Sequence, residues 1–130
     1  MYPLPVRPHG FPPALRIRKG PEFDRVFREG SRAGDALLVV NVLPNGLRHP
    51  RLGLAVGKGV GGAVVRNRVK RLLREAFRLH RAEFPAAHDL VVVAKAPGSA
   101  AYTLAACERS LLSLAAKAAA RAGRRREPPA

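Results

Sequence analysis

The sequence of 130 residues is poor in cysteine, aromatic residues and acidic residues, and these shortages exclude several classes of protein. Cys107 is the single cysteine, so disulfide frameworks and cysteine-rich zinc sites are excluded, and we interpret its side chain as a small buried one. No apolar run approaches the roughly 20 residues that a membrane-spanning helix needs. The first residues, MYPLPVRPHGFPPA, contain too many prolines for the apolar core of a signal peptide. A cytoplasmic location is therefore expected.

Acidic residues number only 9, against 24 lysines and arginines, which gives a formal net charge of +15. Like charges in a small domain repel one another, so an excess of this size is typical of a protein whose partner is a polyanion. Because the apolar pattern gives no support to a membrane partner, nucleic acid is the favoured one. Hydrophobic residues still make up 47% of the chain, which is enough for one folded core.

The chain is predicted to fold as a single domain with a flexible segment at each end. Residues 1–14 hold five prolines and show no periodicity, so we expect a flexible extension there. Residues 15–123 carry the periodic segments and form the predicted domain. Residues 124–130, which begin with three arginines, are predicted to be a basic disordered tail.

The order of the periodic segments predicts an α+β fold. Three segments have the apolar period and the boundary residues of helices: 21–29, 62 to about 83, and 102–122. Four segments have the composition of strands, the first of them a short edge strand: 30–35, 36–43, 51–57 and 89–95. Asn45-Gly46 is predicted to lie in a loop that joins two antiparallel strands. The order α-β-β-β-α-β-α predicts a sheet of about four strands with helices packed on it.

The predicted helix from 62 to about 83 has one apolar arc and one cationic arc. On a helical wheel at about 100° per residue, the apolar arc holds Val65, Val69, Leu72, Leu73, Ala76, Phe77 and His80. The cationic side holds Arg66, Lys70, Arg71, Arg74, Arg78 and Arg81, with Arg68 just beyond. Like charges four residues apart destabilise an isolated helix, and Glu75 is the only acid between 65 and 81. Because the planar guanidinium of arginine matches a phosphate, we interpret this side as a nucleic-acid-binding surface.

A glycine-rich stretch, GKGVGG at 57–62, precedes this helix and satisfies the pattern G-x-G-x-x-G of dinucleotide-binding proteins. We reject that interpretation because the strand before it is predicted to belong to an antiparallel pair. In addition, no acidic residue follows a second strand about 20 residues on, where a ribose hydroxyl would be held. The free N–H groups at the helix start, beside Lys58, would still favour a phosphate.

No catalytic constellation is visible in the sequence. The four histidines are scattered without metal-ligand spacing: His9, His49, His80 and His88. His80 falls on the apolar arc and is interpreted as a histidine at the edge of the core. The serines have no motif around them, and the aspartates form no acid/base pair. We therefore expect no catalytic residue and no metal-binding residue in this chain.

The segment from Arg51 to Phe77 resembles the signature of the bacterial ribonuclease P protein subunit. The most specific match is AVVRNRVKRL at 63–72, with Arg74 following. Further features match in type and spacing: Phe23, Phe27, Gly30 and the strand 89–95. The resemblance covers about 15–123. It implies a left-handed β-α-β crossover, like that in the second domain of a small-subunit ribosomal protein, although most such connections are right-handed.

The resemblance also implies a function, removal of the 5′ leader of precursor tRNA by an endoribonuclease whose RNA subunit is the catalyst. This chain would be the accessory protein, not catalytic alone, with Mg²⁺ bound mainly by the RNA and no organic cofactor. The implied partners are ribonuclease P RNA and precursor tRNA, with no membrane and no obligate protein partner. The residues expected to bind the RNA subunit are Arg66, Asn67, Arg68, Lys70, Arg71, Arg74 and Lys58. The residues expected to bind the 5′ leader are Phe23, Phe27, Arg18 and Arg51.

Some of these assignments remain open. Phe23 and Phe27 have the spacing of a core-facing helix, so they are expected either in the leader cleft or in the core. Glycines at 59 and 62 stand where the family usually has lysine and asparagine, and Asn41 stands near a frequent aromatic. The main alternative function is a ribosomal protein or general RNA chaperone. A DNA-binding module fits less well, because recognition helices usually belong to helical bundles.

Overall fold

A computed structural model describes residues 13–126 of the chain. Most of the predicted N-terminal extension, 1–12, and the last residues, 127–130, lie outside the described residues. The principal elements are α1 (Pro21–Glu29), β1 (Ser31–Gly34), β2 (Leu38–Pro44), β3 (Arg51–Ala55), α2 (Ala63–Leu79), β4 (His88–Ala94) and α3 (Leu104–Arg126). Short 3-10 helices include η1 (Pro13–Leu15), η2 (Lys58–Val60), η3 (Arg81–Glu83) and η4 (Ser99–Ala101). The predicted α+β class and the α-β-β-β-α-β-α order are confirmed.

The four strands form one mixed sheet in the order β1-β2-β4-β3. β2 pairs antiparallel with both β1 and β4, whereas β3 pairs parallel with β4. β2 and β3 run in opposite directions, as predicted, but β4 lies between them, so the Asn45-Gly46 loop closes no hairpin. The side chain of Asn45 instead donates a hydrogen bond to Asp89 Oδ1 at 2.9 Å, which fixes the loop to the start of β4.

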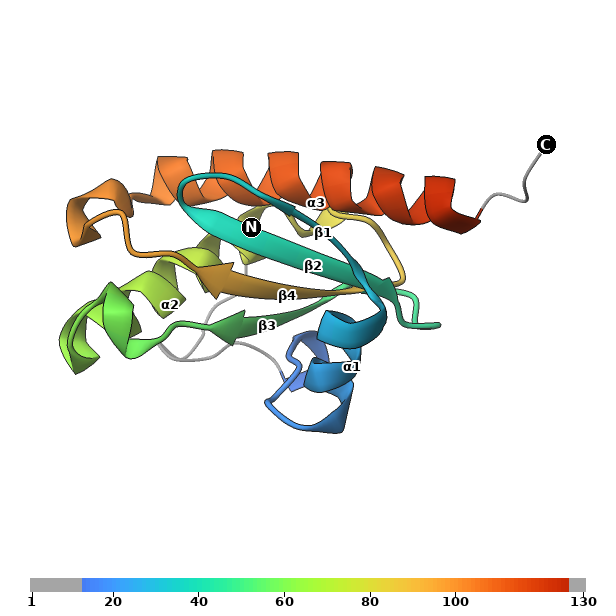
Figure 1. The fold of residues 1–130 in the computed structure, drawn as a ribbon, viewed down its shortest axis with the longest axis horizontal. Helices are drawn as coiled ribbons and strands as arrows, with labels where there is room; N and C mark the ends of the chain where they lie inside the picture. Colours follow the sequence, from blue (N-terminus) through green and yellow to red (C-terminus); the bar gives the residue numbers. More distant parts are fainter. Residues whose placement is uncertain (1–12, 127–130) are drawn as a thin grey trace.

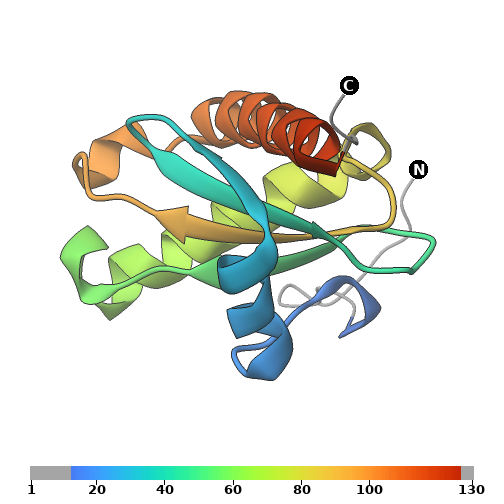
Figure 2. The same cartoon turned by 45° about the vertical axis from the view of Figure 1, so that its right-hand side comes forward.

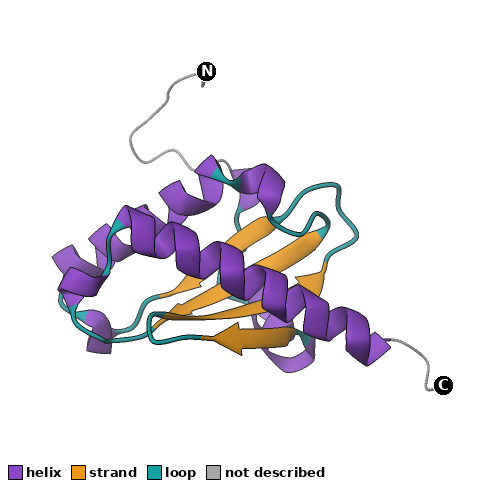
Figure 3. Ribbon diagram, turned by 90° about the horizontal axis from the view of Figure 1, so that it is seen from above, coloured by secondary structure: helices purple, strands orange, loops and turns teal. Residues whose placement is uncertain are grey.

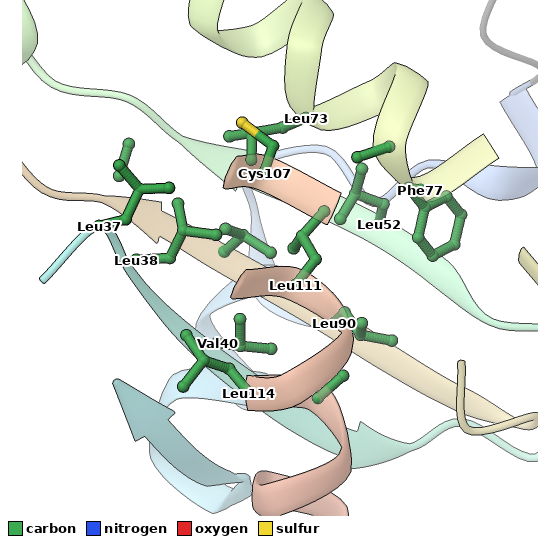
Figure 4. Close-up of a cluster of buried hydrophobic side chains, with 14 of the residues drawn as sticks. Leu37, Leu38, Val40, Leu52, Leu73, Phe77, Leu90, Cys107, Leu111 and Leu114 are labelled. Atoms are coloured by element: carbon green, nitrogen blue, oxygen red, sulfur yellow. The ribbon is translucent and has the colours of Figure 1, made fainter. Parts of the chain in front are cut away.

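Helices cover both faces of the sheet, as Figures 1 and 2 show, with α3 on one side and α1 on the other. Seen from above in Figure 3, α3 runs obliquely across the strands. From Leu90 onward β4 is apolar because it is central and buried on both faces: Leu90 and Val92 belong to the core under α2 and α3, and Val91 belongs to the core under α1. Figure 4 shows the larger core, in which Leu73 and Phe77 of α2 meet residues of α3 and the sheet.

Gly30 joins α1 to β1 at a point where a side chain has no space. A Cβ there would lie 2.5 Å from the carbonyl oxygen of Val26 and 2.6 Å from that of Val42, both of them backbone atoms. Gly53 has a related role in β3, because a Cβ there would lie 3.0 Å from the ring of Phe23. These two glycines allow α1 to pack closely on the sheet.

Two predicted boundaries change. α2 ends at Leu79, and the residues up to Glu83 form η3, because the chain turns at His80 before Pro85. α3 continues to Arg126, so the prediction that the three arginines at 124–126 belong to a disordered tail is wrong for these residues. Arginine is a good helix former, and basic residues are favourable at a helix C-terminus. No helix of residues 13–126 is both long and apolar enough to cross a membrane.

Candidate nucleic-acid interface

The helical wheel correctly predicted which side of α2 packs on the core. Val69, Leu73, Ala76 and Phe77 are buried, and Val65 and Leu72 pack against the same core cluster. The opposite side of the helix therefore faces outward. Val64, next to the predicted RNA-binding residues, is 83% exposed, so even an apolar residue of this side is left uncovered.

Most cations of the outward side have no acidic partner. Among the ion pairs within residues 13–126, none involves Arg66, Lys70, Arg71 or Arg74. Arg78 differs, because its Nη2 lies 2.5 Å from Glu75 Oε2. The single acid of the helix thus neutralises Arg78, the last arginine of α2, and the cations without an acidic partner lie between Arg66 and Arg74.

Arg68 and Asn67 have different surroundings although they are neighbours in the sequence. Arg68 donates a hydrogen bond from Nη2 to the backbone oxygen of Tyr102 at 2.9 Å, which links α2 to the start of α3. Asn67 is exposed on the outward side. Arg68 therefore has a structural contact in addition to its predicted role, whereas the role of Asn67 depends on a partner.

The glycine-rich stretch forms η2 and a turn into α2. Gly61 has φ +156°, and a Cβ there would lie 2.8 Å from the side chain of Val65, so glycine is required at this position. Lys58 is exposed at the start of η2. One argument against a dinucleotide site was wrong, because β3 pairs parallel with β4 and β3-α2-β4 is a β-α-β unit. The other argument holds, because Lys95, not an acid, follows β4.

The two phenylalanines of α1 divide between core and surface. Phe23 is 4% exposed and packs in the smaller core with Ile17, Val26 and Val91. Phe27 is 37% exposed, and its ring centroid lies 5.4 Å from that of Phe23 in an edge-to-face arrangement. Phe23 is therefore a core residue that supports Phe27, and only Phe27 offers a ring face to a ligand.

The two arginines predicted at the leader site also differ. Arg18 is exposed. Arg51 holds the buried carboxylate of Asp89 with two hydrogen bonds of 2.8 Å, from Nε and Nη2, and reaches Glu22 at 3.2 Å. The hydrogen bond to Asp89 raises the pKa of Arg51 above its usual value. Two carboxylates compensate its charge, so Arg51 joins α1, β3 and β4 whatever else it binds.

One cation close to α2 was not predicted to bind RNA. Arg16 lies just after η1, and its backbone forms a bridge with Leu52 of β3, the strand at the edge of the sheet. Burial lowers the pKa of Arg74, and the positive charge of Arg16 lowers it further. The Nε atoms of Arg16 and Arg66 are buried and have no hydrogen-bond partner among the described residues. No sequence signal reveals this proximity, because the two segments are far apart in the chain.

His80 lies at the edge of the core, as predicted, but it also bridges two carboxylates. Its Nδ1 lies 2.6 Å from Glu83 and its Nε2 2.6 Å from Glu108, and these hydrogen bonds raise its pKa. Cys107 is buried, as predicted, and burial raises its pKa to about 11. No group of three or more His, Cys, Asp or Glu side chains within 13–126 is placed to hold a metal ion.

The fold and this surface define a class of protein. It is a small α+β domain in which one side of a helix carries positive charges without acidic partners, and such a side is suited to bind a polyanion. The Ribonuclease P family model matches residues 11–119. A ribonuclease P protein component of Methylococcus capsulatus is 43% identical over 116 residues, which are 86% of this chain and 90% of the relative. One of Desulfovibrio desulfuricans is 48% identical over 113 residues, covering 84% of this chain and 86% of the relative.

Solved structures agree with the sequence relatives. The RNase P protein of Staphylococcus aureus superposes with a TM-score of 0.70 at 34% identity, covering 81% of this chain and 94% of that one. The RNase P protein of Thermotoga maritima gives a TM-score of 0.69 at 31% identity, with 75% and 92% covered. The chain belongs to the ribonuclease P protein family.

Proposed function

We propose that this chain is the protein component of a bacterial ribonuclease P and assists removal of the 5′ leader from precursor tRNA. The observation that carries the proposal is the outward side of α2, where Arg66, Lys70, Arg71 and Arg74 have no acidic partner within 13–126, in a member of this family. Uncompensated cations on a rigid helix attract a polyanion without first breaking internal ion pairs.

The α2 side is the proposed docking surface for the catalytic RNA. The residues assigned to it are Arg66, Asn67, Arg68, Lys70, Arg71, Arg74 and Lys58. Their charges would reduce phosphate repulsion where two RNA molecules meet, and their guanidinium groups would bind phosphates bidentately. Arg68 would contribute partly by holding α2 against Tyr102.

The α1 side is the proposed contact for the single-stranded 5′ leader. Phe27 offers the exposed ring for stacking on a base, Phe23 supports it from the core, and Arg18 adds an exposed cation. Arg51 also lies beside α1, because it pairs with Glu22 of α1 as well as with Asp89 of β4. Since both pairs occupy its guanidinium group, Arg51 would mainly position α1. Leader binding would therefore depend more on Phe27 and Arg18 than on Arg51.

Catalysis is assigned to the RNA subunit. The carboxylates and histidines of residues 13–126 form no cluster suited to Mg²⁺, so the catalytic ions would be bound by the RNA. The protein would add positive charge beside them and lower the Mg²⁺ concentration that the RNA needs.

The test is equilibrium binding to ribonuclease P RNA and to an unrelated structured RNA of equal length, over a series of salt concentrations. We expect tighter binding to ribonuclease P RNA and a steep fall in affinity with salt, because counterions are released from the phosphates. Arg66→Gln/Arg71→Gln should reduce the salt slope by about two. Arg109→Gln/Lys117→Gln removes the same charge from exposed positions of α3 and is the matched control. Equal affinity for both RNAs would favour a general RNA-binding protein instead.

A further inference from the structure

Tyr102 lies in the turn between η4 and α3, and its side chain is fixed to one end of the sheet. The side chain is fully buried in the larger core. Its hydroxyl lies 2.6 Å from the backbone oxygen of Lys95, just after β4, and 2.9 Å from that of Leu37, just before β2. The Tyr102 amide donates to the Ser99 carbonyl at 3.1 Å. Both the side chain and the backbone of this residue are therefore held in place.

The backbone carbonyl of Tyr102 is available to another element, because α3 does not use it. Thr103 caps α3, since its hydroxyl accepts a hydrogen bond from the Ala106 amide at 3.1 Å and its carbonyl accepts one from the Cys107 amide at 3.0 Å. Tyr102 precedes this cap residue, so its carbonyl lies outside the helix. Arg68 Nη2 donates to that carbonyl at 2.9 Å. A buried and fixed residue thus offers α2 a preorganised acceptor.

This hydrogen bond is the polar link between the first half of α2 and the rest of the fold. Among the described residues, no other side-chain hydrogen bond joins that half of the helix to another element. The second half has a link of its own, because His80 at the end of α2 lies 2.6 Å from Glu108 of α3. The bond to Tyr102 therefore fixes the turn of α2 that carries the cations Arg66 and Lys70.

Arg68 stays accessible although one of its nitrogens is bound. The residue is exposed, and it takes part in none of the ion pairs within 13–126. A guanidinium group carries five N–H donors in one rigid plane, so an acceptor that holds one nitrogen sets the direction of the others. Tyr102 therefore orients the donors of Arg68 that point away from the protein.

We propose that Tyr102 is a positioning residue for RNA docking, which acts through Arg68 and does not touch the RNA itself. Its carbonyl sets the direction of the Arg68 guanidinium group and the place of the turn around it. Binding residues must be held to within a fraction of an ångström to be effective, and a buried neighbour commonly supplies that support. The docking role rests on the proposed function, whereas the link between Tyr102 and Arg68 belongs to the free protein.

The first test measures amide hydrogen exchange in the free protein. The amides of residues 67–69 are bonded within α2, and they report local opening of its first half. Arg68→Gln removes the link, so these amides should exchange about five times faster than in the wild type. Arg74→Gln removes one charge from a later turn of the same helix and is the control, with unchanged rates at 67–69. Equal rates in Arg68→Gln and wild type would overturn the link.

The second test measures affinity for ribonuclease P RNA over a series of salt concentrations. Tyr102→Phe keeps the buried ring and removes only the hydroxyl that fixes it. Affinity should fall about fivefold, the effect of one hydrogen bond, with an unchanged salt slope because no charge is lost. Ser110→Ala is the matched control, since it removes a buried hydroxyl of α3 that donates to Asp35 at 2.6 Å, and it should bind as the wild type does. Wild-type affinity in Tyr102→Phe would contradict the proposal.

A double-mutant cycle on the same affinity tests whether Tyr102 acts through Arg68. Tyr102→Phe should cost little further affinity in the Arg68→Gln background. It should cost its full factor in the Arg74→Gln background, because Arg74 lies about 9 Å further along the helix axis. Equal factors in both backgrounds would overturn the proposal.

The two measurements separate the inference from the proposed function. Failure of the wild type to bind ribonuclease P RNA would overturn the proposed function, and the exchange rates would still decide the link. Those rates need no change at Tyr102, so they also decide the link if Tyr102→Phe does not fold.

Discussion

His80 Nε2 lies 2.6 Å from Glu108 Oε2, which ties the C-terminal end of α2 to α3, while Nδ1 of the same ring lies 2.6 Å from Glu83. The two carboxylates raise the pKa of His80 above its ordinary value of 6.5. This stabilisation is complete below about pH 6.5 and is lost as the pH rises through the higher pKa of the folded state. α2 is thus attached most firmly when His80 is protonated.

Replacement of His80 should reduce the pH dependence of stability just above neutrality. We expect the wild type to lose stability as the pH rises from about 6.5, and His80→Gln to lose less over the same range. Urea unfolding at a series of pH values measures this. His88→Gln is the control, because the ring of His88 hydrogen-bonds the backbone oxygen of Ala86 and takes part in none of the ion pairs within residues 13–126. Identical pH profiles for wild type and His80→Gln would contradict the prediction.

The Arg51–Asp89 pair should contribute far more to stability than an exposed pair does. Arg51→Met would leave the buried carboxylate of Asp89 with Asn45 as its one side-chain partner among residues 13–126, at an expected cost of about 3 kcal/mol. Arg25→Gln, which breaks an exposed pair with Glu29, should cost under about 1 kcal/mol. Chemical unfolding compares them, and similar small losses for both would show that Arg51 is not a structural residue.

Gly30 should be sensitive to even the smallest side chain. In Gly30→Ala the new methyl group meets two backbone oxygens that cannot move independently, so we expect a loss of about 3 kcal/mol. Gly57→Ala is a matched control, since a Cβ there meets no atom within 4 Å, and its effect should stay within about 0.5 kcal/mol. Equal unfolding midpoints for the two variants would contradict the close approach of α1 to β2.

Substitution of the two phenylalanines of α1 should have different effects, one on the stability of the protein and the other on binding of the 5′ leader. Phe23→Ala should cost about 3–5 kcal/mol, because the ring fills the smaller core. Phe27→Ala should change stability little and should weaken binding of precursor tRNA relative to mature tRNA. Unfolding measurements and affinities for the two tRNA forms test this pair. If Phe27→Ala binds both forms as the wild type does, the exposed ring does not contact the leader.

Local pattern was sufficient for α2, because the period of its apolar residues fixes which side packs and leaves the cations outside. The same reasoning could not separate Phe23 from Phe27. Both lie on one side of α1, and the difference arises from Gly53, a strand residue that makes space for one ring only. A helix pattern contains no information about the element opposite.

Strand order and edge contacts were also beyond the sequence pattern. The composition of β2, β3 and β4 identifies each as a strand, but not that β4 inserts between the other two. That order follows from burying the most continuously apolar strand at the centre. The position of Arg16 beside Leu52 depends in turn on which strand forms the free edge, so it becomes visible only once the sheet is assembled.

The central claim is that the outward side of α2 enables a catalytic RNA to process precursor tRNA. The most direct measurement is cleavage of precursor tRNA by a bacterial ribonuclease P RNA at low Mg²⁺, without protein, with wild type and with Arg66→Gln/Arg71→Gln. We predict that wild type restores cleavage at the mature 5′ end, that the α2 variant does not, and that Arg109→Gln/Lys117→Gln behaves as wild type. Binding of the wild type without any change in cleavage would contradict the claim.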